Sequence, residues 1–208
     1  MRKLILASEL TASLPSLARE LAEDAPGGRL LFVPTAARGE GWEPDDETHV
    51  RPFEGMGFEV RKFDLEGRTA EDVGDALDWA TALYVCGGNT FYLMAHMRLS
   101  GFAGLVADRV DDGLAYIGSS AGALAACPSI GYAESLDDRS KGDGNYAGLG
   151  LVDFLVLPHM NHPDFGPAVR RVYAAIKESG GPLCIALDDG QMAVVEGRSV
   201  RIVQEPRS

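Results

Sequence analysis

A serine between two glycines is the first feature of the sequence that could carry out a reaction. The segment Gly118-Ser119-Ser120-Ala121-Gly122 follows a short apolar run and matches the pattern G-x-S-x-G. In hydrolases with this pattern, the middle serine lies on a strained turn between a strand and a helix, and small neighbours allow the two elements to approach closely. We therefore predict Ser120 as a nucleophile; a tight turn with a serine N-cap is the alternative.

A histidine that could activate this serine follows a second apolar run. A serine hydroxyl is a poor nucleophile unless a neighbouring imidazole takes its proton. Pro158-His159 comes directly after the strand-like residues 154–157, so we predict His159 as the base. A metal site built from His159 and His162 would have no third ligand in the pattern, and we predict no metal and no cofactor.

The carboxylate that would orient the imidazole is expected soon after the serine. Glu134 lies nearest the end of the apolar stretch that follows Ser120, and we predict it as the acid. Asp137 and Asp138 remain alternatives, although they are also typical loop or turn residues. Asp189-Gly190 matches a hairpin turn, and we assign it to that turn.

A second glycine cluster could stabilise the negative charge that develops on a substrate oxygen. Cys86-Gly87-Gly88-Asn89-Thr90 ends a predicted strand and begins a helix, and ligand sites of α/β proteins collect at this edge of the sheet. We predict that the N–H groups of Gly88 and Ala121 form an oxyanion hole. A glycine-rich turn with Asn89 as helix N-cap is the alternative.

Alternating β-type and helical patterns would place these residues in one α/β domain over residues 1–208. Strands are predicted at residues 4–7, 30–34, 59–63, 82–86, 115–118, 154–157, 183–187, 192–196 and 200–203. Helices are predicted at residues 14–22, 45–53, 70–80, 90–99, 121–126 and 166–179. We expect a mostly parallel sheet with helices on both faces, a long loop at 134–150, and a C-terminal antiparallel hairpin extension.

Charge and cysteine content restrict the possible partners and compartment. The formal net charge of −12 opposes binding to nucleic acid and to anionic membranes. Cys86, Cys127 and Cys184 show no CxxC spacing and lie in apolar surroundings, which predicts buried free thiols and a reducing compartment. No apolar run reaches the ~18 residues of a membrane-spanning helix. We therefore expect a cytoplasmic protein.

Four segments together resemble peptidase family S51, the peptidase E or aspartyl dipeptidase group. They are Cys-Gly-Gly-Asn-Thr-Phe at 86–91, Tyr-Ile-Gly-Ser-Ser-Ala-Gly at 116–122, Cys-Pro-Ser-Ile at 127–130 and Pro-His at 158–159. The resemblance implies a fold like that of the class I glutamine amidotransferases, with a serine nucleophile at Ser120 and an oxyanion hole from the Gly-Gly-Asn loop. It also implies hydrolysis of dipeptides with an N-terminal aspartate. With Glu134 in place of an aspartate, the expected triad is Ser-His-Glu.

An N-terminal aspartate would need a cation for its side chain and an acceptor for its ammonium group. Asp188 or Asp189 could be this acceptor, although the hairpin turn alone explains Asp189-Gly190. Arg170 and Arg171 are candidates because guanidinium groups bind carboxylates bidentately, and Asn89 is a further candidate for substrate binding. The expected partner is a small peptide, and the protein would be a monomer or homodimer. Alternatives are a cyanophycinase-like peptidase with a larger cleft, or a non-catalytic binding protein. A small esterase of the α/β-hydrolase type would need more than 39 residues between Ser120 and His159.

Overall fold

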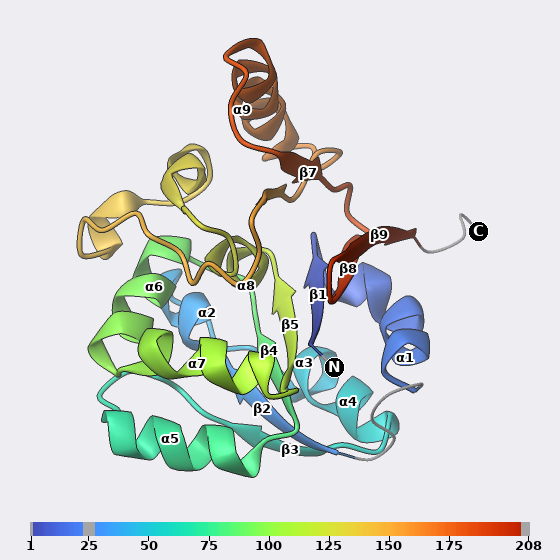
Figure 1. Ribbon diagram of the computed structural model, residues 1–208, viewed down its shortest axis with the longest axis vertical. Helices are drawn as coiled ribbons and strands as arrows, with labels where there is room; N and C mark the ends of the chain where they lie inside the picture. The colour runs from blue at the N-terminus through green and yellow to red at the C-terminus, as the bar shows by residue number, and fades with distance from the viewer. Residues whose placement is uncertain (1, 23–27, 205–208) are drawn as a thin grey trace.

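A seven-stranded, mostly parallel β-sheet forms the centre of the computed structural model, which describes residues 2–22 and 28–204 (Figure 1). The strands follow the order β3-β2-β4-β5-β1-β8-β9. Their bounds are β1 Lys3–Ala7, β2 Arg29–Val33, β3 Glu59–Lys62, β4 Ala82–Val85, β5 Ala115–Ser119, β8 Gln191–Glu196 and β9 Ser199–Gln204. Strands β1 to β5 run parallel, whereas β8 is antiparallel to β1 and to β9. This confirms the predicted parallel sheet with a C-terminal hairpin extension.

Helices cover both faces of this sheet (Figure 1). The helices are α1 Leu14–Ala22, α2 Thr35–Gly39, α3 Asp46–His49, α4 Arg51–Gly55, α5 Ala70–Trp79, α6 Thr90–Leu99, α7 Phe102–Asp111, α8 Ala121–Ala125 and α9 Gly166–Glu178. Side chains alternate along a strand, so Leu83 and Val85 of β4 join the core under α5 to α8, while Ala82 and Tyr84 join the core under α1 and α4. The central strands are therefore apolar on both faces, as predicted.

A second, two-stranded sheet stands apart from the main one. Strand β6 (Leu155–Leu157) pairs in parallel with β7 (Cys184–Ala186), and α9 connects them. Figure 1 shows β7 and α9 projecting beyond the body that holds the main sheet. The prediction of a hairpin turn at Asp189-Gly190 is wrong, because β7 pairs with β6 and not with β8. Residues 187–190 instead cross from the small sheet to the main one.

The remaining differences from the predicted elements are local. Helices α2 and α7 were not predicted, and the expected helix at 45–53 is split into α3 and α4. The expected loop contains two 3-10 helices, η2 (Gly131–Ser135) and η3 (Arg139–Lys141). Cys86 and Cys127 are buried free thiols, as predicted, whereas Cys184 is half-buried. Within the described ranges, no helix has the length and apolar character needed to cross a membrane.

Candidate active site

Ser120 occupies the predicted elbow between β5 and α8. Its backbone angles, φ 49° and ψ −109°, lie in a region that side-chain-bearing residues rarely adopt. The turn is tight: a Cβ on Gly122 would lie 2.2 Å from the carbonyl oxygen of Val85, and one on Gly118 would lie 2.5 Å from the carbonyl oxygen of Gly122. The Ser120 N–H donates to the carbonyl of Ala7, 3.1 Å away. Strained backbone of this kind is characteristic of functional sites.

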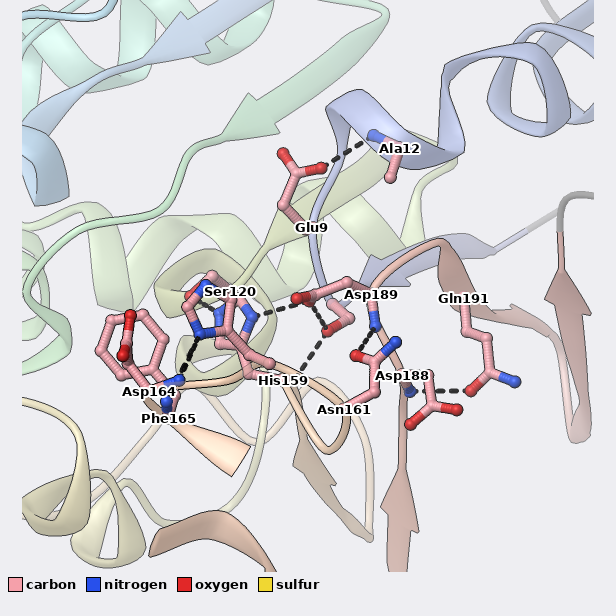
Figure 2. Close-up of polar contacts among 12 residues, drawn as sticks. Glu9, Ala12, Ser120, His159, Asn161, Asp164, Phe165, Asp188, Asp189 and Gln191 are labelled. Carbon is pink, nitrogen blue, oxygen red and sulfur yellow. Dashed lines mark hydrogen bonds and ion pairs between the residues drawn. The ribbon is translucent and has the colours of Figure 1, made fainter. Parts of the chain in front are cut away.

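His159 lies directly against this serine. It follows β6 and Pro158, is almost fully buried, and has a left-handed backbone with φ 65°. Its Nε2 lies 2.9 Å from Ser120 Oγ, and its Nδ1 lies 2.7 Å from Asp189 Oδ1 (Figure 2). The structure thus brings together the two residues predicted as nucleophile and base. Both ring nitrogens of His159 have protein partners, which argues against the metal site considered with His162.

The carboxylate beside the imidazole is Asp189, so the prediction of Glu134 is wrong. Glu134 is exposed and binds the Tyr146 hydroxyl and the Arg139 guanidinium, which together lower the pKa of its carboxyl. Its side chain does not reach the site because η2 holds it on the outer surface of the loop. Asp189 reaches the imidazole because the crossover from β7 to β8 passes the end of β6.

The two alternative acids do not contact the imidazole nitrogens either. Asp138 caps η3 by accepting from the Ser140 N–H. Asp137 accepts from the main-chain N–H of Thr90 at 2.8 Å, and burial raises the pKa of its carboxyl. Asp137 nevertheless lines the same cavity as Ser120 and His159, so it belongs to the surroundings of the site.

Hydrogen bonds keep Asp189 in place and favour its charged form. Burial by itself would raise the pKa of the Asp189 carboxyl, but the hydrogen bonds from His159 and Ser8 outweigh it and lower the pKa. The Asp189 main-chain N–H donates to Asn161 Oδ1 at 2.8 Å (Figure 2). An ionised carboxylate at this position keeps the proton of a neutral imidazole on Nδ1 and leaves the Nε2 lone pair facing Ser120.

The predicted oxyanion donors lie beside the serine. Gly87 and Gly88 line the cavity, and Gly88 has φ 135°, where a Cβ would lie 2.2 Å from the carbonyl group of Ala36. The N–H of the next residue, Asn89, donates to that same carbonyl. The N–H groups of Gly88 and Ala121 donate to no protein acceptor in residues 2–22 and 28–204, which leaves both available to a ligand.

The residues predicted to bind substrate are placed elsewhere. The Asn89 side chain is fully buried and caps α6 by accepting from the Tyr92 N–H, which agrees with the alternative prediction of Asn89 as a helix N-cap. Its NH₂ group donates to Glu40. Arg170 is exposed and donates to the carbonyl of Met160, and Arg171 is exposed on α9. None of the three predicted residues lines the cavity.

The cavity in front of Ser120 has a volume of about 470 Å³ and a mixed aromatic and acidic wall. Besides His159, its aromatic and acidic members are Trp42, His49, Phe165, Glu9, Glu40 and Asp137. Burial lowers the pKa of His49, which therefore contributes a neutral ring. No arginine or lysine belongs to this wall within the part of the chain that the structure describes. A ligand with a positive charge and an apolar portion suits such a surface.

A strained serine on an elbow, next to an imidazole that is held by a carboxylate, is the arrangement typical of hydrolases that form an acyl-enzyme. The comparisons with known proteins identify a family of peptidases, which are hydrolases. The family model of peptidase family S51 matches residues 4–203. The chain belongs to peptidase family S51.

Relatives in several bacteria share most of the chain. An uncharacterised peptidase of Listeria innocua is 32% identical over 181 residues, covering 86% of both chains. One from Pasteurella multocida is 29% identical over 206 residues, covering 98% of both. Peptidase E of Nostoc sp. is 27% identical over 84% of this chain and 72% of its own. A crystal structure of a candidate peptidase E protein from Listeria monocytogenes superimposes with a TM-score of 0.89 at 26% identity. The superposition covers 99% of this chain and 100% of that chain.

Proposed function

We propose that this chain is a serine-type peptidase that hydrolyses short peptides through an acyl-enzyme. The observation that carries the proposal is the continuous path of hydrogen bonds from Ser120 through His159 to Asp189. In this proposal Ser120 is the nucleophile, His159 is the general base and acid, and Asp189 orients the imidazole. The main-chain N–H groups of Gly88 and Ala121 stabilise the oxyanion.

The reaction would proceed in two halves. In the first, Ser120 Oγ attacks the peptide carbonyl while its proton passes to His159 Nε2, and a tetrahedral oxyanion forms between the two N–H donors. His159 then gives this proton to the leaving amine, and the C–N bond breaks to give an ester on Ser120. In the second half, water attacks the ester with His159 again as base, which releases the acid and restores the serine.

The cavity wall supports substrates with a free N-terminal amine. Glu9, Glu40 and Asp137 line the cavity in front of the serine. Glu40 is paired with Lys141 at 3.2 Å, and burial raises the pKa of Asp137, so the main attraction for an ammonium group comes from Glu9, which accepts hydrogen bonds from the neutral N–H groups of Thr11 and Ala12. A substrate aspartate would instead bring a negative charge against an acidic wall whose described lining has no arginine or lysine, and the adjacent Lys141 is already paired with Glu40. We therefore propose that unblocked peptides with a neutral N-terminal residue are better substrates than the N-terminal aspartyl peptides that the family resemblance suggests.

Labelling with a fluorophosphonate probe tests the chemistry. The wild-type protein should be labelled, S120A should not, and S119A should be labelled because the neighbouring hydroxyl is not on the hydrogen-bonded path. Absence of labelling in the folded wild-type protein would contradict the peptidase proposal and favour a non-catalytic binding protein.

Four dipeptides test the substrate class: Ala-Leu, Asp-Leu, Glu-Leu and N-acetyl-Ala-Leu. We expect Ala-Leu to be cleaved fastest, Asp-Leu and Glu-Leu at least 10-fold more slowly, and the acetylated peptide least of all. Faster cleavage of Asp-Leu than of Ala-Leu would contradict the proposed preference and support an aspartyl dipeptidase. Equal cleavage of the acetylated peptide would exclude recognition of the free amine.

A further inference from the structure

Ser8 connects all the segments that carry the proposed base and acid. It follows β1 and is fully buried. Its hydroxyl lies 2.8 Å from Asp189 Oδ1 and 2.7 Å from the main-chain nitrogen of His159. Its own N–H donates to the carbonyl of Gln191, 3.0 Å away. One small side chain thus joins the end of β1, the loop after β6 and the crossover before β8.

The chemistry of these partners fixes the direction of both hydroxyl bonds. A main-chain N–H can only donate, so the Ser8 oxygen accepts from His159. An ionised carboxylate can only accept, so the Ser8 proton points to Asp189 Oδ1. The hydroxyl therefore has a single satisfied orientation. Asp189 Oδ1 receives two hydrogen bonds, one from Ser8 and one from the His159 ring.

The same end of β1 also contacts the segment that carries the nucleophile. The residue before Ser8 is Ala7, whose carbonyl accepts the N–H of Ser120, and Ala7 is paired with Ser119 across β1 and β5. Ala7 and Ser8 therefore contact all three members of the proposed triad. The left-handed backbone of His159 is unfavourable for a residue with a side chain and needs neighbours that hold it. Ser8 accepts the N–H of this residue.

We infer that Ser8 is a positioning residue for the proposed peptidase reaction, holding the main chain of His159 and the carboxylate of Asp189 in register with Ser120. This inference rests on the proposed function. Ser8 is not part of the cavity wall and acts only through these two residues. The Ser8 hydrogen bond is also one of the contacts that lower the pKa of Asp189, together with His159 and the nearby His162.

The test compares S8A and S8C with the wild type. Cysteine preserves most of the serine volume, but its thiol is a weak hydrogen-bond donor and acceptor, so it separates packing from hydrogen bonding. S100A is the matched control, because Ser100 is likewise buried and bonds a main-chain carbonyl, that of His96, outside the site. Each variant is first checked for a cooperative thermal transition.

We expect S8A and S8C to lower kcat for Ala-Leu and the rate of Ser120 labelling by about 10- to 100-fold, the range for loss of a hydrogen bond to a charged group. KM should change less than 3-fold, since Ser8 does not touch the substrate. S100A should keep wild-type rates. Wild-type rates in S8C would show that Ser8 only fills space, and wild-type rates in S8A would remove it from the mechanism; either result overturns the inference.

A spectroscopic measurement separates this inference from the proposed function. The proton between His159 Nδ1 and Asp189 can be followed by NMR and assigned by its loss in H159Q. Its signal should shift or broaden in S8A and S8C and stay unchanged in S100A. If the wild-type protein is labelled no faster than S120A, the peptidase proposal fails, and an unchanged signal in S8A would independently overturn the positioning inference.

Discussion

Replacement of Asp189 by asparagine tests the assignment of Asp189, in place of the predicted Glu134, as the carboxylate that orients His159. The change keeps the shape of the side chain but removes its charge. In the structure, Asp189 Oδ1 accepts from both His159 Nδ1 and Ser8 Oγ. An asparagine can either turn its NH₂ group toward these donors, which repels them, or keep an oxygen there without the negative charge that stabilises an imidazolium.

The two outcomes set the expected magnitude. A hydrogen bond to a charged group contributes about 1.5–3 kcal/mol in total, so loss of the charge lowers the rate by at most roughly 10- to 150-fold through this bond. If the NH₂ group forces the other imidazole tautomer, the loss approaches about 10⁴-fold, the value for the same change in a Ser-His-Asp triad. We therefore expect kcat of D189N to fall by about 10- to 10⁴-fold.

The matched control is E134Q. Glu134 is exposed and contacts Tyr146 and Arg139 on the loop surface, so its substitution should leave kcat within about 2-fold of the wild type. Single-turnover release of the amine from Ala-Leu, with both variants shown to be folded by circular dichroism, measures the chemical step. A large loss in E134Q with near-normal activity in D189N would refute the assignment of the acid.

Two further predictions concern stability. G88A should lower the free energy of unfolding by about 2–5 kcal/mol in a urea titration. The φ of 135° at Gly88 is strained for alanine, and the new Cβ would overlap the Ala36 main chain. The control G74A, at an open helical position, should be neutral or stabilising. For Glu20, the hydrogen bond from Arg201 is the main cause that lowers the pKa below its usual value of 4.5. The interaction stabilises the fold above that pH and is lost as the pH falls through the folded-state pKa, so E20Q should destabilise the protein by about 1 kcal/mol at pH 7 and match the wild type near pH 2. A constant difference between E20Q and the wild type at all pH values would contradict this reasoning.

The parallel sheet could be predicted from the sequence because its strands carry local signals. Leu30 to Val33 and Ala82 to Val85 are apolar at every position, and burial on both faces demands this. Helix α7 was missed, although its apolar residues Phe102, Val106 and Val110 recur every fourth position. Helix α7 begins directly after Gly101, which has a left-handed backbone and lies two residues beyond the end of α6. In the sequence, a glycine at this position indicates a loop and not the start of a second helix.

Ser120 and His159 could be predicted because each follows a recognisable strand. Asp189 could not be assigned in the same way, because Asp-Gly between two β-type runs is a strong local sign of a hairpin. Only the long-range pairing of β7 with β6 shows that the chain makes a crossover there. One usable signal was present: Asp189 comes soon after an apolar strand, as His159 does, and carboxyl ends of parallel strands share one edge.

The division of the strands into two sheets has a consequence for how this site could be controlled. The elbow and the proposed oxyanion donors belong to the large sheet, whereas His159 follows β6 and Asp189 follows β7 of the small one. Ser8 ties the two parts together, because its hydroxyl lies at the end of β1 in the large sheet and bonds both the His159 main chain and the Asp189 carboxylate. A displacement of the small sheet would therefore stretch these two hydrogen bonds as well as the 2.9 Å contact to Ser120. Movement of the small sheet would interrupt proton transfer from the Ser120 hydroxyl only if the Ser8 hydrogen bonds also give way.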